Sequence, residues 1–225
     1  MPMSHCSAAI AALAVSTSFS AVHADVVVSS FPNWDSSSGV AITGTTVAVG
    51  QTFAAPAGGG ANTLDAFTIR VNATSTVSGV RAYVFATSAG GTEATGAPLY
   101  RSNIFPTMAP TGGFIMVSYT GLNAPVTPGQ NYVLLFSNAE SGSAFSMNGF
   151  QVASMFTGSS AAAPLLGNAV SFAPTPSGSM TGLTTTPWTN LSSSRDLALE
   201  LRFVPTPGTC GVVGLGLLAA ARRRR

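Results

Sequence analysis

The fold is decided by one stretch of the sequence, Thr63-Leu64-Asp65-Ala66-Phe67-Thr68-Ile69-Arg70-Val71. Apolar side chains recur here at every second position, at Phe67, Ile69 and Val71. The positions between them hold Thr68 and Arg70, so polar side chains share the other face. A period of two is typical of a β-strand with one buried face. We therefore expect a half-buried strand over residues 63–71.

The same period recurs along the chain, most regularly in residues 196–204. The inward face is expected to hold Leu197, Leu199, Leu201 and Phe203, and the outward face Ala198, Glu200 and Arg202. Asp196 is four residues from Glu200 and is expected on the same face as Glu200. Further strands are expected at residues 26–31, 40–43, 46–53, 80–86, 113–119, 131–137 and 144–152. No segment shows a convincing helical period with caps. About nine short strands joined by turn-rich links predict an all-β fold, an antiparallel β-sandwich or jelly roll.

One region does not follow the strand pattern. Residues 154–194 are rich in Ser, Thr, Ala, Gly and Pro. Such a length is too great for a structureless loop in a compact domain. We expect one more strand inside it, at residues 168–173, and an excursion of the remainder over one end of the sandwich.

The C-terminal residues have a three-part order. Pro205-Thr206-Pro207-Gly208 is followed by twelve largely apolar residues, 210–221, and then by Arg222, Arg223, Arg224 and Arg225. A helix of that length reaches roughly 18 Å, whereas the hydrocarbon core of a bilayer is about 30 Å thick. We therefore expect a short apolar helix that enters the membrane only transiently. The arginines are expected to stay cytoplasmic.

This tail resembles a PEP-CTERM sorting signal, which exosortase-type transpeptidases read in bacteria that make extracellular polysaccharide. One position departs from the family pattern, because Thr206 stands where the family has a central Glu. The resemblance implies an exosortase-type partner and a protein that is membrane-associated before its C-terminus is processed. It also implies a final location at the bacterial surface or in the extracellular matrix, in contact with exopolysaccharide.

The N-terminus is consistent with export. Residues 8–22 are moderately apolar, and Val22-His23-Ala24 places small residues at −3 and −1 before Asp25. This layout predicts a secretory signal peptide over residues 1–24, handled by the Sec machinery and signal peptidase. An uncleaved N-terminal membrane helix is the alternative. Residues 25–204 then form one β-sandwich domain, and residues 205–225 form the sorting signal.

The composition of residues 25–204 excludes most enzyme classes. Both histidines and both cysteines lie in the predicted end segments, and the chain has no lysine. Serine nucleophiles, zinc sites and phosphate loops need those side chains. Residues 25–204 contain five arginines and seven acidic residues, which gives a net charge of −2. No basic surface for nucleic acid is therefore expected. We expect no enzyme, no cofactor and no metal.

Carboxylate chemistry stays open. A glycosidase needs two carboxyl groups, and the candidates are Asp65, Glu93, Glu140, Asp196 and Glu200. Nothing in the sequence favours any two of them. Asp35 and Asn33 could give oxygen ligands to calcium, but an Asx-turn ahead of the following serines explains Asp35 more simply.

The body of the chain carries a second resemblance. It rests on residues 50–56 (GQTFAAP), 64–71 (LDAFTIRV), 125–136 (PVTPGQNYVLLF), Trp188 and 196–203 (DLALELRF). In that order they are similar to choice-of-anchor β-sandwich domains, which are exported with interchangeable C-terminal sorting tags. The resemblance implies a sugar-binding-like jelly roll and lends no catalytic residue.

Two tryptophans, Trp34 and Trp188, are the candidate ligand-binding residues, because an exposed indole ring can stack on a sugar. A tryptophan in a loop can also plug the end of a sandwich. The sequence therefore predicts a non-catalytic surface or matrix protein, with a carbohydrate-binding module as the alternative and a carboxylate glycosidase as the remote alternative. Solvent exposure of the tryptophans separates the first two.

Overall fold

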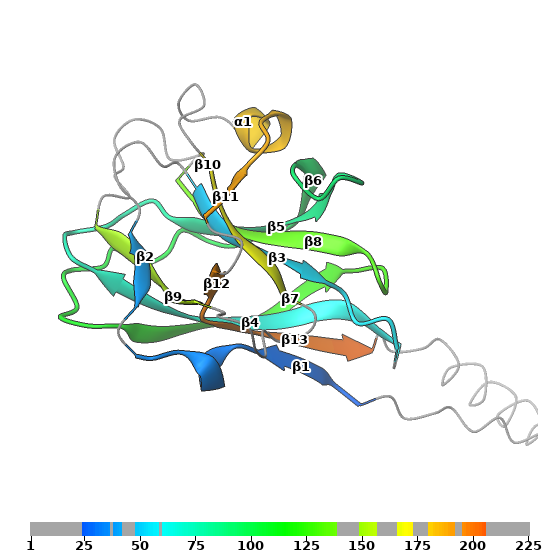
Figure 1. Ribbon diagram of the computed structural model, residues 1–225, viewed down its shortest axis with the longest axis horizontal. Helices are drawn as coiled ribbons and strands as arrows, with labels where there is room; N and C mark the ends of the chain where they lie inside the picture. Colours follow the sequence, from blue (N-terminus) through cyan, green and yellow to red (C-terminus); the bar gives the residue numbers. More distant parts are fainter. Residues whose placement is uncertain are drawn as a thin grey trace, which may run out of the picture. The chain divides into compact units, whose positions relative to one another are not determined.

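Strand β4 (Ala61–Ala73), predicted over residues 63–71, lies at the centre of a seven-stranded antiparallel sheet. This sheet has the order β1-β13-β4-β9-β12, with β2 paired to β9 and β7 paired to β4. The bounds are β1 (Val26–Ser29), β2 (Gly39–Ala41), β7 (Ile115–Pro125), β9 (Phe150–Phe156), β12 (Arg195–Leu197) and β13 (Leu199–Pro205). A second, six-stranded antiparallel sheet packs against it, and together the two sheets form an all-β fold consistent with a β-sandwich (Figure 1).

The second sheet has the order β11-β10-β3-β8-β5-β6. Its strands are β3 (Ala48–Ala54), β5 (Arg81–Thr87), β6 (Ala94–Arg101), β8 (Asn131–Ser137), β10 (Leu166–Phe172) and β11 (Thr189–Asn190). Two short helices accompany the sheets, η1 (Phe31–Asn33) and α1 (Met180–Thr185).

This computed structural model describes residues 24–36, 38–41, 48–58, 60–138, 149–156, 166–172, 180–191 and 195–205. All of them belong to one compact unit, His23–Gly208. Residues 1–23 of the predicted signal peptide lie outside the described residues, and so do Thr206, Pro207, Gly208, the apolar run and Arg222, Arg223, Arg224 and Arg225 of the predicted sorting signal. Glu140 and the first part of the strand predicted at 144–152 also lie outside them.

The core between the sheets confirms the predicted inward face of β4. Phe67, Ile69 and Val71 are at most 1% exposed. The ring of Phe67 meets that of Phe136 from β8 edge-on, with 6.0 Å between the centroids. The apolar faces that the alternation creates are buried against each other between the two sheets. Removing apolar area from water favours this packing.

The second sheet is buried on both faces, which the sequence did not reveal. Its outer face carries a separate hydrophobic cluster of Ala48, Tyr83, Phe85, Ala94, Val133, Leu135, Val170, Leu183 and Trp188. Leu183 comes from α1, so Leu183 and Trp188, two residues of the region expected over one end of the sandwich, instead cover this face. Strands buried on both faces have continuous apolar runs. This explains why Tyr132 through Phe136 in β8 are all buried.

Within this region, the strand predicted at 168–173 is confirmed by β10. Helix α1 and strand β6 were not predicted. Strand β6 contains Gly96 and Pro98, which read as a loop, but it forms an edge of the sheet. An edge strand tolerates proline because one side of its backbone needs no partner.

The strand predicted at 196–204 is interrupted at Ala198. The backbone N–H of Ala198 donates to Ala153 O at 2.7 Å, where the chain passes from β9 (paired with β12) to β4 (paired with β13). The predictions that Ala198 and Asp196 face outward beside Glu200 are wrong, because Ala198 is 0% and Asp196 only 3% exposed. Asp196 is buried where Gln51 donates to its carboxylate at 2.9 Å.

The first and last described strands are neighbours. In the antiparallel pair of β1 and β13, Val26 lies opposite Phe203. Ala24 and Pro205 therefore lie at the same end of the first sheet (Figure 1). An ion pair joins the same two segments, with 3.2 Å between Asp25 Oδ2 and Arg202 Nε.

Candidate functional site

Arg70 lies on the outer face of the first sheet between two aromatic rings. Its guanidinium carbon is 5.4 Å from the ring centroid of Phe31 and 5.0 Å from that of Trp34. Trp34 in turn meets the ring of Phe114 edge-on, at 5.2 Å and 81°. We call Phe31, Trp34, Arg70 and Phe114 the Arg70 cluster. Arg70 and Phe114 are far in sequence from Phe31 and Trp34 and meet them only in the fold.

A hydrogen-bonded turn holds Trp34 in place. The indole Nε1–H donates to Ser38 O at 2.8 Å. The backbone N–H of Ser38 donates to Asp35 Oδ1 at 2.8 Å, and the Ser38 hydroxyl donates to Asp35 Oδ2 at 2.7 Å. Both carboxylate oxygens of Asp35 therefore serve the turn, as the Asx-turn interpretation expects.

Gly39 makes room for Phe114 in the cluster. A Cβ atom at position 39 would meet Phe114 Cζ at 2.5 Å. Since real Cβ contacts are essentially never that short, a larger residue at position 39 would require the Phe114 ring to shift. Phe114 packs against Trp34, so such a shift would also disturb Trp34.

Arg70 differs from Arg202 on the same sheet face. Arg202 is neutralised by two carboxylates, Asp25 at 3.2 Å and Asp65 at 3.5 Å. Among the described residues Arg70 makes cation–π contacts with the two rings and forms no ion pair or side-chain hydrogen bond. Its Nε is buried without an acceptor there, whereas its terminal nitrogens are not buried. The cluster therefore presents a positive group whose terminal N–H donors point to solvent.

Neutral polar side chains surround Arg70 on this face. The hydroxyls of Thr68 and Ser118 are 2.9 Å apart. Asn72 Nδ2 donates to Gln151 Oε1 at 2.9 Å, and Thr111 Oγ1 donates to Asn72 Oδ1 at 2.8 Å. These bonds fix the side chains and leave further donors, such as the amide of Gln151, for a ligand.

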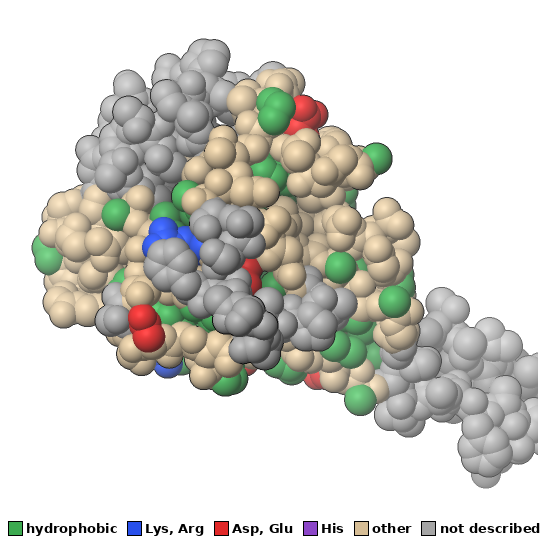
Figure 2. Space-filling view, viewed as in Figure 1, with side chains coloured by type: hydrophobic (Ala, Val, Ile, Leu, Met, Phe, Trp, Pro, Cys, Tyr) green, Lys and Arg blue, Asp and Glu red, His purple; other side chains and the backbone are tan. Residues whose placement is uncertain are grey.

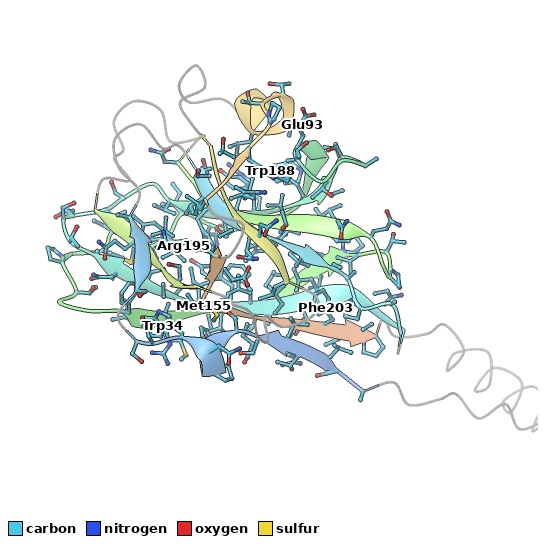
Figure 3. All side chains as sticks on the ribbon, viewed as in Figure 1. Trp34, Glu93, Met155, Trp188, Arg195 and Phe203 are labelled. Atoms are coloured by element: carbon cyan, nitrogen blue, oxygen red, sulfur yellow. The ribbon has the colours of Figure 1, made fainter. Side chains whose placement is uncertain are left out.

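The structure separates the two tryptophans predicted as ligand-binding residues. Trp188 lies beside β11 in the cluster that covers the second sheet, and Trp34 lies on the side of the first sheet (Figure 3). Trp188 is 6% exposed, so its ring has almost no surface for stacking on a sugar. Trp34 is half-buried and lies in the Arg70 cluster, with the Arg70 guanidinium over its ring.

A buried pair of polar side chains, Gln51 and Asp196, links the two sheets. Asp196 was a candidate from the sequence, whereas Gln51 was not identified. Gln51 in β3 is fully buried. Its Nε2 donates to Asp196 Oδ1 at 2.9 Å and to Gly167 O at 3.0 Å, and its Oε1 accepts from the N–H of Leu197 at 2.8 Å. The signal in the sequence was a glutamine in the middle of the apolar strand AVGQTFA.

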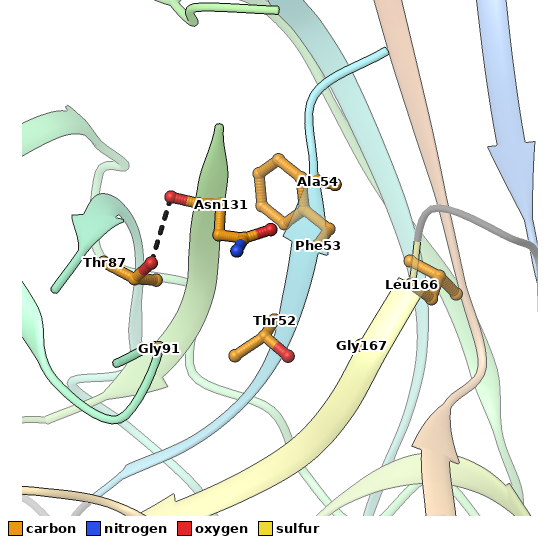
Figure 4. Close-up of a pocket in the computed structure, with 8 residues that line it drawn as sticks. All are labelled: Thr52, Phe53, Ala54, Thr87, Gly91, Asn131, Leu166 and Gly167. Atoms are coloured by element: carbon orange, nitrogen blue, oxygen red, sulfur yellow. Dashed lines mark hydrogen bonds between the residues drawn. The ribbon is translucent and has the colours of Figure 1, made fainter. Parts of the chain in front are cut away.

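A pocket of about 300 Å³ lies at one end of the second sheet (Figure 4). Its lining residues are Thr52, Phe53, Ala54, Thr87, Gly91, Asn131, Leu166 and Gly167. The hydroxyl of Thr87 donates to Asn131 O at 3.2 Å, and Thr52 Oγ1 accepts from the N–H of Asn168 at 2.8 Å. None of the lining side chains among the described residues is ionisable.

The carboxylates considered for a glycosidase lie in different settings. Asp65 binds Arg202, Asp196 binds Gln51, Glu93 lies in the turn before β6, and Glu200 lies opposite Thr68 on the outer face. None of these four lines the pocket. Within the described part of the chain, no three His, Cys, Asp or Glu side chains gather as metal ligands would.

No protein-family model, curated protein or solved structure matches the chain. Among the helices of the described residues, none has the length and apolar character needed to cross a membrane.

The buried Asp196 predicts a pH-dependent stability. Burial raises the pKa of Asp196 above its usual 3.8, and the hydrogen bond from Gln51 lowers it in part. The folded protein therefore holds this proton more tightly than the unfolded chain does. The resulting contribution to stability is complete below about pH 3.8 and is lost as the pH rises through the folded-state pKa.

The variant Asp196→Asn keeps an acceptor for Gln51 but does not titrate. We expect its free energy of unfolding, relative to that of the natural protein, to rise between pH 4 and pH 7 (approximate limits from the usual carboxyl range). Urea unfolding of both proteins at several pH values measures the difference. A difference that stays constant or falls over this range would contradict the prediction.

Proposed function

We propose that this chain is an exported, non-catalytic protein of the bacterial surface or extracellular matrix. In this proposal an exosortase-type transpeptidase processes its C-terminus, and the folded domain acts through its surface within an exopolysaccharide layer. The observation that carries the proposal is the three-part tail: Pro205-Thr206-Pro207-Gly208, twelve largely apolar residues and Arg222–Arg225. The predicted signal peptide at the other end supports the same route.

The fold supports the proposal through the position of its ends. Strand β13 ends at Pro205, the first residue of the proposed sorting signal. Asp25, the first residue after the proposed signal-peptide cut, is ion-paired with Arg202 of the same strand. The two described residues that adjoin the proposed segments are therefore close together at one end of the first sheet, which is compatible with processing at a membrane. The finer assignment of the sandwich as a jelly roll of choice-of-anchor type belongs to the same proposal.

A carbohydrate-binding module is the second candidate function. The observation that favours it is the Arg70 cluster, in which a half-buried Trp34 lies among hydrogen-bonding side chains on a sheet face. The two candidates are compatible, because a matrix protein can hold its place by binding the polymer around it.

Deletion of residues 206–225 tests the proposal. This deletion keeps Pro205 and therefore all of β13. We expect the natural protein to reach the cell surface as a species that begins at Asp25 and lacks Arg222–Arg225, and the deletion variant to be lost from the surface. Intact-mass measurement and envelope fractionation in the native bacterium give both results.

The substitution Thr206→Glu is the matched control, since it restores the family's central Glu and should preserve or increase processing. A full-length C-terminus retained in the inner membrane would overturn the proposal. The tail would then be a short permanent anchor.

A further inference from the structure

We propose that the Arg70 cluster is a binding site for an acidic polysaccharide, and that Arg70 binds a carboxylate group of its uronic acid units. The choice of a polysaccharide rests on the proposed function, which places the protein in such a polymer. The choice of an acidic one rests on the geometry of Arg70 itself.

The first step is the state of the guanidinium group. An arginine without an acidic partner is unusual on a face where Arg202 is bound by both Asp25 and Asp65. Within the described residues, the terminal nitrogens of Arg70 have no acceptor and are not buried. Guanidinium N–H donors that face solvent can bind the oxygens of an external acceptor.

The second step is the shape of the site. Phe31 and Trp34 hold the guanidinium at 5.4 Å and 5.0 Å by cation–π contact, so its orientation is fixed before a ligand arrives. The buried Nε is out of a ligand's reach, and binding falls to the terminal nitrogens at the end of the group. A planar pair of N–H donors matches the two oxygens of a carboxylate.

The third step is the character of the surrounding face. Next to Arg70, β4 and β7 carry the Thr68 and Ser118 hydroxyls, and β9 carries the Gln151 amide. Such groups exchange hydrogen bonds with sugar hydroxyls. The carboxylate of Glu200, opposite Thr68, is a further acceptor for hydroxyls.

Charge limits the expected strength of binding. Charged side chains are sparse on the face shown in Figure 2, and residues 25–204 carry a net charge of −2. The protein therefore has no strong field that would attract a polyanion over long distances. Binding depends on the local contact at Arg70 and gains strength from the repetition of uronate units along the polymer.

The experiment compares two arginines of the same sheet face. The full chain in mild detergent is tested against immobilised polygalacturonate, neutral dextran, dextran sulfate and poly-glutamate. Arg70→Gln is expected to weaken binding to polygalacturonate by about tenfold to a hundredfold, the usual effect of losing a charge-assisted pair of hydrogen bonds. Arg202→Gln removes the same charge from a neutralised site and should change binding by less than about twofold.

Several outcomes would overturn the proposal. Equal weakening by the two substitutions would mean that only net charge matters. Equally tight binding to neutral dextran would remove the role of the carboxylate, and binding to dextran sulfate alone would assign a sulfate ligand instead. Poly-glutamate binding as tight as polygalacturonate binding would show that the site takes carboxylates on any polymer, proteins included.

A second variant guards against misfolding of Arg70→Gln, which near-ultraviolet circular dichroism would detect. Arg70→Lys keeps the charge but loses the planar fork, and it should weaken polygalacturonate binding several-fold. Unchanged binding by this variant would also overturn the proposal. Binding does not need the sorting tail, so the 206–225 deletion should still bind polygalacturonate. Failure of the sorting proposal and failure of the site are thereby distinguished.

Discussion

Replacement of Trp188 by alanine is expected to lower the free energy of unfolding by about 3–5 kcal/mol, the usual cost of removing a large buried ring. Trp188 is 6% exposed and packs with Leu183 against the outer face of the second sheet. Its loss would open that face to water beside Tyr83 and Val133, which are now fully buried.

Trp34→Ala is the matched comparison and is expected to cost only about 1–2 kcal/mol, because a half-buried ring has less contact to lose. The change removes the contacts with Arg70 and Phe114 and the hydrogen bond to Ser38. Urea unfolding of the full chain, followed by circular dichroism, measures both values. Equal losses in the free energy of unfolding for the two substitutions would contradict the prediction that Trp188 stabilises the packing on the outer face of the second sheet.

Replacement of Gln51 by leucine is expected to cost at least about 2 kcal/mol, although leucine has a similar size and is apolar. Two buried groups lose their partner, the carboxylate of Asp196 and the N–H of Leu197, and the exposed Gly167 loses the hydrogen bond to its carbonyl. Each polar group left buried without a hydrogen bond costs about 1–3 kcal/mol. The substitution leaves the backbone pairing of β3 with β8 and β10 unchanged. The loss in the free energy of unfolding therefore measures the contribution of the side-chain hydrogen bonds of Gln51.

A double variant isolates the interaction of Gln51 with Asp196. Gln51→Leu combined with Asp196→Leu removes both partners, and we expect it to be more stable than the sum of the single changes implies. The reason is that no charged group then remains buried without a donor. Strict additivity in the same urea measurements would show that the two side chains do not depend on each other.

Much of the fold could be predicted because strand patterns are local. The alternation in residues 63–71 identified β4 and its inward face, and the run at residues 131–137 coincides with β8. Where the local signal was ambiguous, prediction failed. Strand β6 contains glycine and proline, and only its place at a sheet edge makes it a strand.

The candidate site could be predicted only in part. Trp34 was identified as a ligand-binding candidate, but its partners Arg70 and Phe114 come from distant parts of the chain. Gln51 and Asp196 are separated by 145 residues, and no local pattern connects them. Contacts of this kind depend on sheet order and register.

By itself the sequence determined that the chain is built from β-strands with apolar inner faces, because alternation is a property of neighbouring residues. The export and sorting segments also follow from local composition, and they stay predictions of the sequence. Only the tertiary structure decided that Trp188 is buried and Trp34 half-buried, that Asp196 is buried against Gln51, and that among the described residues Arg70 has aromatic neighbours but no acid. Burial and pairing are set by which layers of the fold meet, and no stretch of sequence contains that information alone.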